Sequence, residues 1–134
     1  MAERYLIDTN IIIYFFKDDF SEKEVERLSE IFDTSFNLSV IAQIEFLGWR
    51  GFTEEQFIQA SQFLDSANII PIDKNVAEQT IRLMRQQKIK LPDAIIAATC
   101  ILHNFILVTR NFKDFTGVTD LTLLNPFSED SYID

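Results

Sequence analysis

Cysteine, histidine, glycine and proline are all scarce in this chain of 134 residues. The single cysteine, Cys100, excludes the disulfide framework of small secreted domains, so a reducing cytoplasm is the expected compartment. The single histidine, His103, excludes a Cys/His zinc site and disfavours Ser-His-Asp or histidine-based nuclease chemistry. Three glycines and three prolines leave no room for a flexible linker, and the length fits one domain spanning residues 1–134.

Long apolar runs are also lacking. Asp8 interrupts the first apolar run, so the N-terminus does not have the pattern of a signal peptide. The nearly apolar segment from Ala94 to Val108 contains His103 and Asn104, and it falls short of the roughly 20 residues that a bilayer requires. We interpret it as a buried helix followed by a strand, and we expect no association with a membrane.

Positive charge is in short supply. Twelve lysines and arginines stand against 21 acidic residues, which gives a formal net charge of −9. This balance disfavours a nonspecific nucleic-acid binder, whose affinity depends on neutralising phosphates. It does not exclude metal-dependent cleavage of RNA, because metal ions and a few local cations can meet the phosphate.

Short apolar runs alternate with amphipathic segments along the whole chain. We expect strands at residues 5–7, 36–38, 69–72 and 105–108, with a possible fifth at 121–124. Between them we expect one helix that begins at Ile11 after a Thr9 or Asn10 cap and a second that follows Ser21, with Glu24 completing a capping box. Further helices are expected near residues 40–49, 54–64, 74–87 and 92–103, the first three of them after Ser39, Thr53 and Asp73. This alternation predicts a mainly parallel sheet that is covered on both faces.

Asp8, Glu45 and Asp93 each stand alone in an apolar stretch. Residues 5–16, 38–49 and 91–109 contain no other Asp, Glu, Lys or Arg. An ionised carboxylate among apolar residues is costly unless a partner compensates its charge. A shared divalent cation such as Mg²⁺, which prefers oxygen ligands, would compensate all three. Without the ion, at least one of them should have a raised pKa.

Two of these acids also have a structural interpretation. Asp8 is placed to cap the following helix, and Asp93 lies in a first helical turn where the helix dipole favours a negative charge. Glu45 lies inside its predicted helix, so a helix end does not explain it.

Four segments together resemble the PIN domain family, most closely the VapC toxins of type II toxin–antitoxin systems. They are Leu6-Ile7-Asp8-Thr9-Asn10, the run from Ser39 to Phe46, the run from Leu91 to Thr99 and the run from Val108 to Phe115. The resemblance covers nearly the whole chain, in order. It implies an α/β/α sandwich with a central, mainly parallel β-sheet, and an endoribonuclease that depends on Mg²⁺ or Mn²⁺.

The resemblance also implies roles for individual residues. Asp8, Glu45 and Asp93 match the three most characteristic metal-binding acids, and Asp114 is the candidate for a fourth catalytic acid, because Asn111 stands where some relatives carry Asp. Thr9, Asn10 and Thr109 are expected to orient the carboxylates, and Asn111 to coordinate through its carbonyl or orient a water. Arg110 and Lys113, beside the expected site, are candidates for phosphate contact or else surface charges without a role. An antitoxin protein is the implied partner. Residues 14–16 with Phe46 and Trp49 suggest a homodimer surface or an antitoxin groove, or else core packing.

Three rival interpretations remain at this point. A phosphatase with an aspartyl nucleophile at Asp8 would need a second acid two residues later, where the chain has Asn10. A noncatalytic phospho-receiver would need an acidic pair after the first strand and a lysine after a late strand, and Thr109-Arg110 does not fit. A PIN domain that has lost its activity and survives as a binding module stays open.

Overall fold

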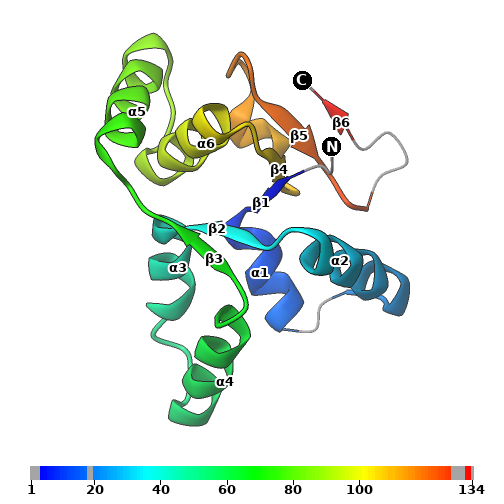
Figure 1. Ribbon diagram of the computed structural model, residues 1–134. Coiled ribbons are helices and arrows are strands. Elements are labelled where there is room, and N and C mark those ends of the chain that lie inside the picture. The colour runs from blue at the N-terminus through cyan, green and yellow to red at the C-terminus, as the bar shows by residue number, and fades with distance from the viewer. Residues whose placement is uncertain (1–3, 18–19, 128–131, 134) are drawn as a thin grey trace.

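One six-stranded β-sheet organises the chain in the order β3-β2-β1-β4-β5-β6 (Figure 1). The computed structural model describes residues 4–17, 20–127 and 132–133. Five strands pair in parallel, and β6 pairs with β5 in the antiparallel direction. Their bounds are β1 Tyr5–Ile7, β2 Asn37–Ser39, β3 Asn68–Ile70, β4 Ile106–Val108, β5 Thr122–Leu124 and β6 Tyr132–Ile133. The five expected strands are confirmed, and β6 was not expected.

Helices cover both faces of the sheet, so the expected three-layer α/β/α arrangement is confirmed. In Figure 1, α5 and α6 lie on one side of the sheet, and α1, α2 and α4 lie on the other. The bounds are α1 Thr9–Phe16, α2 Glu22–Thr34, α3 Val40–Leu47, α4 Glu54–Leu64, α5 Lys74–Gln86 and α6 Leu91–His103, followed by the 3₁₀ helix η1 Phe112–Phe115. None of the helices within the described residues has the length and apolar character needed to cross a membrane.

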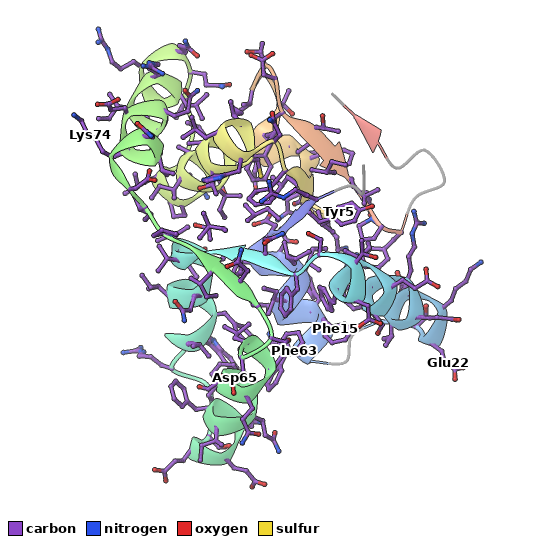
Figure 2. The ribbon with its side chains drawn as sticks, viewed as in Figure 1. Tyr5, Phe15, Glu22, Phe63, Asp65 and Lys74 are labelled. Atoms are coloured by element: carbon purple, nitrogen blue, oxygen red, sulfur yellow. The ribbon has the colours of Figure 1, made fainter. Side chains whose placement is uncertain are left out.

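The alternation of side chains along β1 separates two hydrophobic cores. Tyr5 and Ile7 face the core shared with α1 to α4, whereas Leu6 faces the core shared with α5 and α6. The first core is rich in phenylalanine: Phe15 and Phe63, labelled in Figure 2, stack with ring centroids 5.6 Å apart. The second core is mainly aliphatic and contains the buried Cys100.

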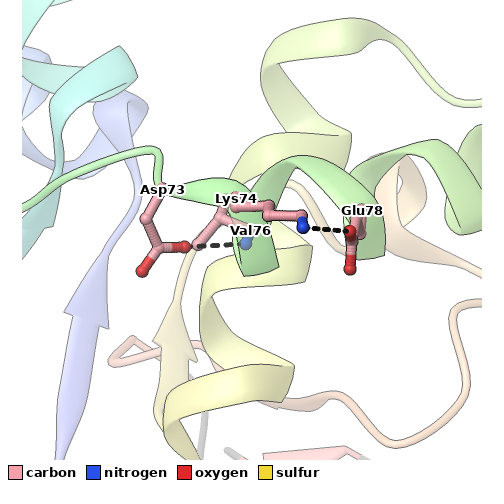
Figure 3. A network of polar contacts seen from close by, with 4 residues as sticks. All are labelled: Asp73, Lys74, Val76 and Glu78. Carbon is pink, nitrogen blue, oxygen red and sulfur yellow. Dashed lines mark hydrogen bonds and ion pairs between the residues drawn. The ribbon is translucent and has the colours of Figure 1, made fainter.

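Side chains close the N-termini of most helices as the sequence predicts. Ser21 and Thr53 form reciprocal capping boxes with Glu24 and Gln56. The Asp73 carboxylate accepts a hydrogen bond of 2.9 Å from the backbone N–H of Val76 at the start of α5 (Figure 3). The Lys74–Glu78 ion pair drawn beside it spans 4.0 Å and is exposed, so it adds little stability.

Two predicted helix ends are wrong. The first helix begins at Thr9 rather than Ile11. Its N-cap is Asp8, which accepts the backbone N–H of Thr9, so the structural interpretation of Asp8 as a cap is confirmed and the expected cap at Thr9 or Asn10 is wrong. The third helix ends at Leu47 rather than Trp49, with Gly48 at its C-terminal end. Trp49 therefore lies in the loop that joins α3 to α4, where it is exposed.

The strand order reverses direction at β1. The chain moves from β1 outward through β2 to β3, then returns to place β4 on the other side of β1. Loops at the carboxyl ends of β1 and β4 separate at such a point and leave a crevice. Asp8 and Thr109 directly follow these two strands.

Candidate active site

An open hollow of about 340 Å³ lies beyond the carboxyl ends of β1, β2 and β4. Asp8 reaches it from the end of β1, Glu45 from α3 and Asp93 from the first turn of α6. Asn111 and Asp114 reach it from the segment after β4. Four acids that are up to 106 positions apart in the numbering (Asp8 to Asp114) therefore line one hollow, which we call the acid hollow.

Asp8 is the most firmly held of these acids, with only 5% of its surface exposed. One carboxylate oxygen accepts the backbone N–H of Thr9 at 2.8 Å. The other accepts the Thr109 hydroxyl at 2.7 Å and the Asn10 side-chain amide at 2.9 Å. The phosphatase interpretation requires Asp8 to attack as a nucleophile. Its burial and the engagement of both its oxygens in hydrogen bonds disfavour that role.

Thr109 joins the end of β4 to this arrangement. Its side chain is fully buried, and its hydroxyl, while donating to Asp8, accepts the backbone N–H of Asn111 at 3.0 Å. Its own backbone N–H donates to Leu124 O of β5 at 3.0 Å. The hydroxyl therefore fixes both the Asp8 carboxylate and the start of the loop that leads to Asp114.

Glu45 is held by a different threonine. The Thr9 hydroxyl donates to its Oε1 at 2.9 Å. Glu45 is exposed, Asp93 is half-buried and Asp114 is exposed. The expectation that all three isolated acids pay a burial cost therefore holds for Asp8, holds in part for Asp93 and is wrong for Glu45.

Burial and neighbouring charge raise two pKa values in the hollow. The pKa of Asp8 rises to about 6 because burial disfavours its charged form and Asp93 and Glu45 add repulsion, against hydrogen bonds from Thr109 and Thr9. The pKa of Asp93 also rises to about 6, through partial burial and the charges of Asp114 and Glu45. The expected direction is confirmed, but burial contributes more than repulsion between the acids.

The donor set suits a hard divalent cation. Every polar side chain that lines the hollow offers oxygen, as Mg²⁺ and Mn²⁺ prefer. Asn10 adds a telling feature: its Nδ2 donates to Asp8, and its Oδ1 is buried without a hydrogen-bond partner. In the described part of the chain no three Asp, Glu, His or Cys side chains are already grouped as metal ligands. An ion bound in the hollow would bring Glu45, Asp93 and Asp114 together with Asp8.

The cations near the acid hollow differ in part from Arg110 and Lys113, the two that the sequence suggested. Lys113 lines an adjoining hollow of about 320 Å³ with Lys88 and Lys90, and this hollow shares Asp93 and Asp114 with the acid hollow. Sequence reasoning missed Lys88 and Lys90, although they directly precede the Leu91-Pro92-Asp93 segment.

Arg110 does not line either of these hollows. Its guanidinium lies over three aromatic rings, with centroids 5.0 Å away for Tyr14, 5.6 Å for Phe20 and 5.5 Å for Phe127. These contacts join the start of the β4–η1 loop to α1 and to the segment after β5. The contacts indicate a structural role.

A model of the PIN domain family matches residues 5–120, a range that contains all four acids of the hollow. The chain belongs to the PIN domain family. Among curated proteins it is similar to Ribonuclease VapC1 of Methanocaldococcus jannaschii, with 29% identity over 126 residues that cover 90% of this chain and 85% of the relative.

Solved structures agree with this assignment. A toxin–antitoxin complex from Klebsiella pneumoniae contains a chain with 34% identity and a TM-score of 0.75, and the match covers 92% of this PIN domain and 98% of that chain. The DNA-bound VapBC complex from Salmonella typhimurium matches with a TM-score of 0.78 at 19% identity, covering 94% and 99%. At that identity the second likeness shows the fold alone.

Proposed function

We propose that this PIN domain is a Mg²⁺- or Mn²⁺-dependent endoribonuclease and the toxin of a type II toxin–antitoxin pair. The observation that carries the proposal is the acid hollow at the point where the strand order reverses, with Asp8 fixed by three hydrogen-bond donors. Similarity to a protein named Ribonuclease VapC1 and to a chain of a toxin–antitoxin complex supports the activity and the biological role.

In this proposal Asp8, Glu45 and Asp93 hold the metal, and Asp114 is a further catalytic acid. A bound divalent ion supplies an activated water and positive charge against the scissile phosphate. Thr109 and Asn10 hold the Asp8 carboxylate, and Thr9 orients Glu45. Such supporting hydrogen bonds hold a ligand in its binding geometry.

The remaining residues serve the substrate in smaller ways. Asn111 supplies an amide oxygen but no charge, and its backbone N–H is engaged by Thr109. Lys88, Lys90 and Lys113 gather beside Asp93 and Asp114, where a phosphate backbone entering the acid hollow would need cations. Local lysines of this kind let a chain with a net charge of −9 contact RNA.

The partners proposed are RNA and a separate antitoxin protein, in a homodimeric cytoplasmic toxin. The antitoxin rests on the likeness to the Klebsiella pneumoniae complex. Phe46 is almost fully buried, and Phe15 and Phe16 pack in the aromatic core, so these residues serve the interior of the chain first. Of the aromatic residues named for a surface, Trp49 and Tyr14 remain exposed.

Neutralising the acids tests the activity. Asp8→Asn, Glu45→Gln and Asp93→Asn should each reduce Mn²⁺-dependent cleavage of RNA by more than about 100-fold, because each removes a ligand rather than an outer hydrogen bond. Cleavage is measured on a labelled RNA with and without chelator. Asp33→Asn, which removes an exposed carboxylate from α2, is the matched control and should cleave normally. Cleavage that survives chelation, or near-normal turnover in two of the three variants, overturns the proposal.

A further inference from the structure

A second hollow, of about 160 Å³, adjoins the acid hollow and differs from it in character. Its walls are mostly apolar, with Lys17 and Glu45 as the charged residues that line it, and Ile13 and Glu45 line both hollows. Its aromatic residues come from α1, from α3 and from the loop after α3; they are Phe16, Phe46, Trp49 and Phe52. We call it the aromatic hollow.

The floor of this hollow is rigid. Phe16, Phe46 and Phe52 contact one another edge to face, with ring centroids 5.5–5.6 Å apart. Phe46 is 2% exposed and belongs to the hydrophobic core. Such mutually packed rings do not rearrange without disturbing the core.

Trp49 is held in place by its neighbours, and about half of it is exposed. Its ring meets Phe52 edge to face at 5.1 Å, and the backbone of Gly51 lies so close that a Cβ there would come 2.2 Å from Trp49 Cζ2. Yet 51% of the residue is exposed. A side chain that is positioned this tightly and left half open is available for stacking.

We propose that the aromatic hollow binds one unpaired nucleobase of the RNA, adjacent to the phosphate that enters the acid hollow. The inference rests on the proposed ribonuclease function and deepens it. Because bases in a duplex are stacked within the helix, it implies that the substrate is single-stranded or locally unpaired at this nucleotide.

Three features favour a nucleobase over an apolar protein segment. The shared Glu45 makes the two hollows continuous, so one nucleotide chain can occupy both. The Lys17 ammonium lies over the Trp49 ring, 5.2 Å from its centroid, so a stacking base must displace this flexible side chain, whose charge then remains near the phosphate of the nucleotide. The volume of about 160 Å³ is below that of ordinary drug-sized pockets and suits one ring system rather than a helix face.

Base stacking also helps an acidic protein to bind RNA. Stacking on an aromatic side chain does not require positive charge and tolerates any base, because every base has a π face. With a net charge of −9, the chain has little general attraction for phosphate. Affinity for unpaired RNA then comes from this hollow and from a few local lysines.

Trp49 is the only tryptophan, so its fluorescence reports directly on the hollow. The probe is a single-stranded oligouridylate added to the Asp93→Asn variant in chelator, where it is not cut and one repelling charge is gone. We expect saturable quenching by this RNA. An abasic ribose-phosphate oligomer of equal length, with the same charge and no bases, should quench little, as should duplex RNA. Equal quenching by the abasic oligomer, or none by any RNA, overturns the inference. Quenching by an apolar helical peptide alone overturns it in favour of a protein partner.

Kinetics separate this inference from the proposed function. Trp49→Leu should raise KM for single-stranded RNA about tenfold, the loss expected for one stacked base, and leave kcat unchanged. Gly51→Ala, which displaces the ring without removing it, should act in the same direction. Phe57→Leu, which changes an exposed aromatic residue of α4 outside the hollow, is the control.

Each result decides one of the two claims. Metal-dependent cleavage with an unchanged KM in Trp49→Leu overturns the base-binding hollow and keeps the ribonuclease. Base-dependent quenching by a wild type that cuts no RNA overturns the ribonuclease and keeps the hollow.

Discussion

Asp8 and Asp93 line the same hollow and share a pKa of about 6, but the chain holds them in opposite ways. Asp8 is buried at the end of β1, with three donors on its two oxygens. Asp93 is half-buried in the first turn of α6, and only burial and neighbouring charges act on its pKa. One acid is held by three hydrogen bonds before any ligand arrives, whereas the pKa of the other reflects burial and neighbouring charges.

The difference teaches how a cluster of like charges can exist in a stable fold. Hydrogen bonds from Thr109 and Thr9 offset part of the cost of burying the Asp8 charge, so that position belongs to both the structure and the proposed chemistry. The Asp93 charge is repelled by the charges of Asp114 and Glu45, and Lys90 partly opposes this repulsion. We therefore expect substitutions of Asp8 and Asp93 to have similar effects on activity and different effects on stability.

The largest of the remaining effects should come from the threonine that holds Asp8. Thr109→Val removes the 2.7 Å hydrogen bond to the carboxylate with little change in shape, and should reduce cleavage about 10- to 100-fold. Thr109→Ser keeps the hydroxyl and should recover most of the activity, which a purely packing role would not explain. Both are measured as kcat at saturating Mn²⁺. If Thr109→Val lowers kcat no more than Thr109→Ser does, Asp8 does not depend on this hydrogen bond, and the contrast between Asp8 and Asp93 does not hold.

Much of this arrangement is predictable from the sequence because it follows the chain locally. The carboxyl ends of parallel strands meet at one edge of the sheet. Asp8 after β1 and Thr109 after β4 are therefore expected at the same edge. Isolation among apolar residues singled out Asp8, Glu45 and Asp93 and predicted a raised pKa for at least one of them, which the raised pKa values of Asp8 and Asp93 confirm. Helix caps at Ser21, Ser39 and Thr53 were equally predictable, since they depend on a few neighbouring residues.

Features that depend on distant contacts were not predictable. Arg110 was expected near a phosphate, but the guanidinium lies over rings from α1, from the segment before α2 and from the segment after β5. The aromatic hollow exists because α3 ends at Leu47 and leaves Trp49 in a loop against Gly51. Strand β6 is two residues long and exists only through its pairing with β5.

The pH dependence of cleavage should sharpen the comparison. With folded-state pKa values of about 6, both acids take up protons as the pH falls through 6, and a protonated carboxyl is a poor ligand. Cleavage should therefore fall below about pH 6 in low Mn²⁺, and the midpoint should move to lower pH as Mn²⁺ is raised, because ion and proton compete.

In the wild type the hydrogen bond from Thr109 lowers the pKa of Asp8. Thr109→Val removes this bond, so the pH midpoint of cleavage should move upward. Lys90→Gln should do the same through Asp93, whose pKa the lysine lowers. Rates measured from pH 5 to pH 8 check this. A profile that is flat across pH 6 would show that neither acid titrates as the structure indicates.

The smallest effect, in thermal stability, distinguishes the two acids most directly. Asp93→Asn removes repulsion of order 1 kcal/mol for charges a few ångströms apart near water, so in chelator at pH 7.5 it should melt about 3 °C above wild type. Asp8→Asn also removes a charge whose pKa is raised, but it places an amide N–H group against the donors Thr109 and Asn10. We expect the lost charge-assisted hydrogen bonds to outweigh the relief of the buried charge, so this variant should melt below wild type.

The sign with pH follows from the raised pKa of Asp93, which goes from 3.8 to about 6. The folded state binds the proton more tightly than the unfolded state, so the charge costs stability progressively as the pH rises from about 4 through 6. The advantage of Asp93→Asn should thus be absent near pH 4 and complete above about pH 7. Mn²⁺ at ten times its Kd should add about 1.4 kcal/mol to the wild type and less to either variant. If Asp93→Asn instead melts below wild type at pH 7.5, the wild-type Asp93 carboxylate stabilises the start of α6 by more than the neighbouring acids repel it. Asp8 and Asp93 would then have the same effect on stability.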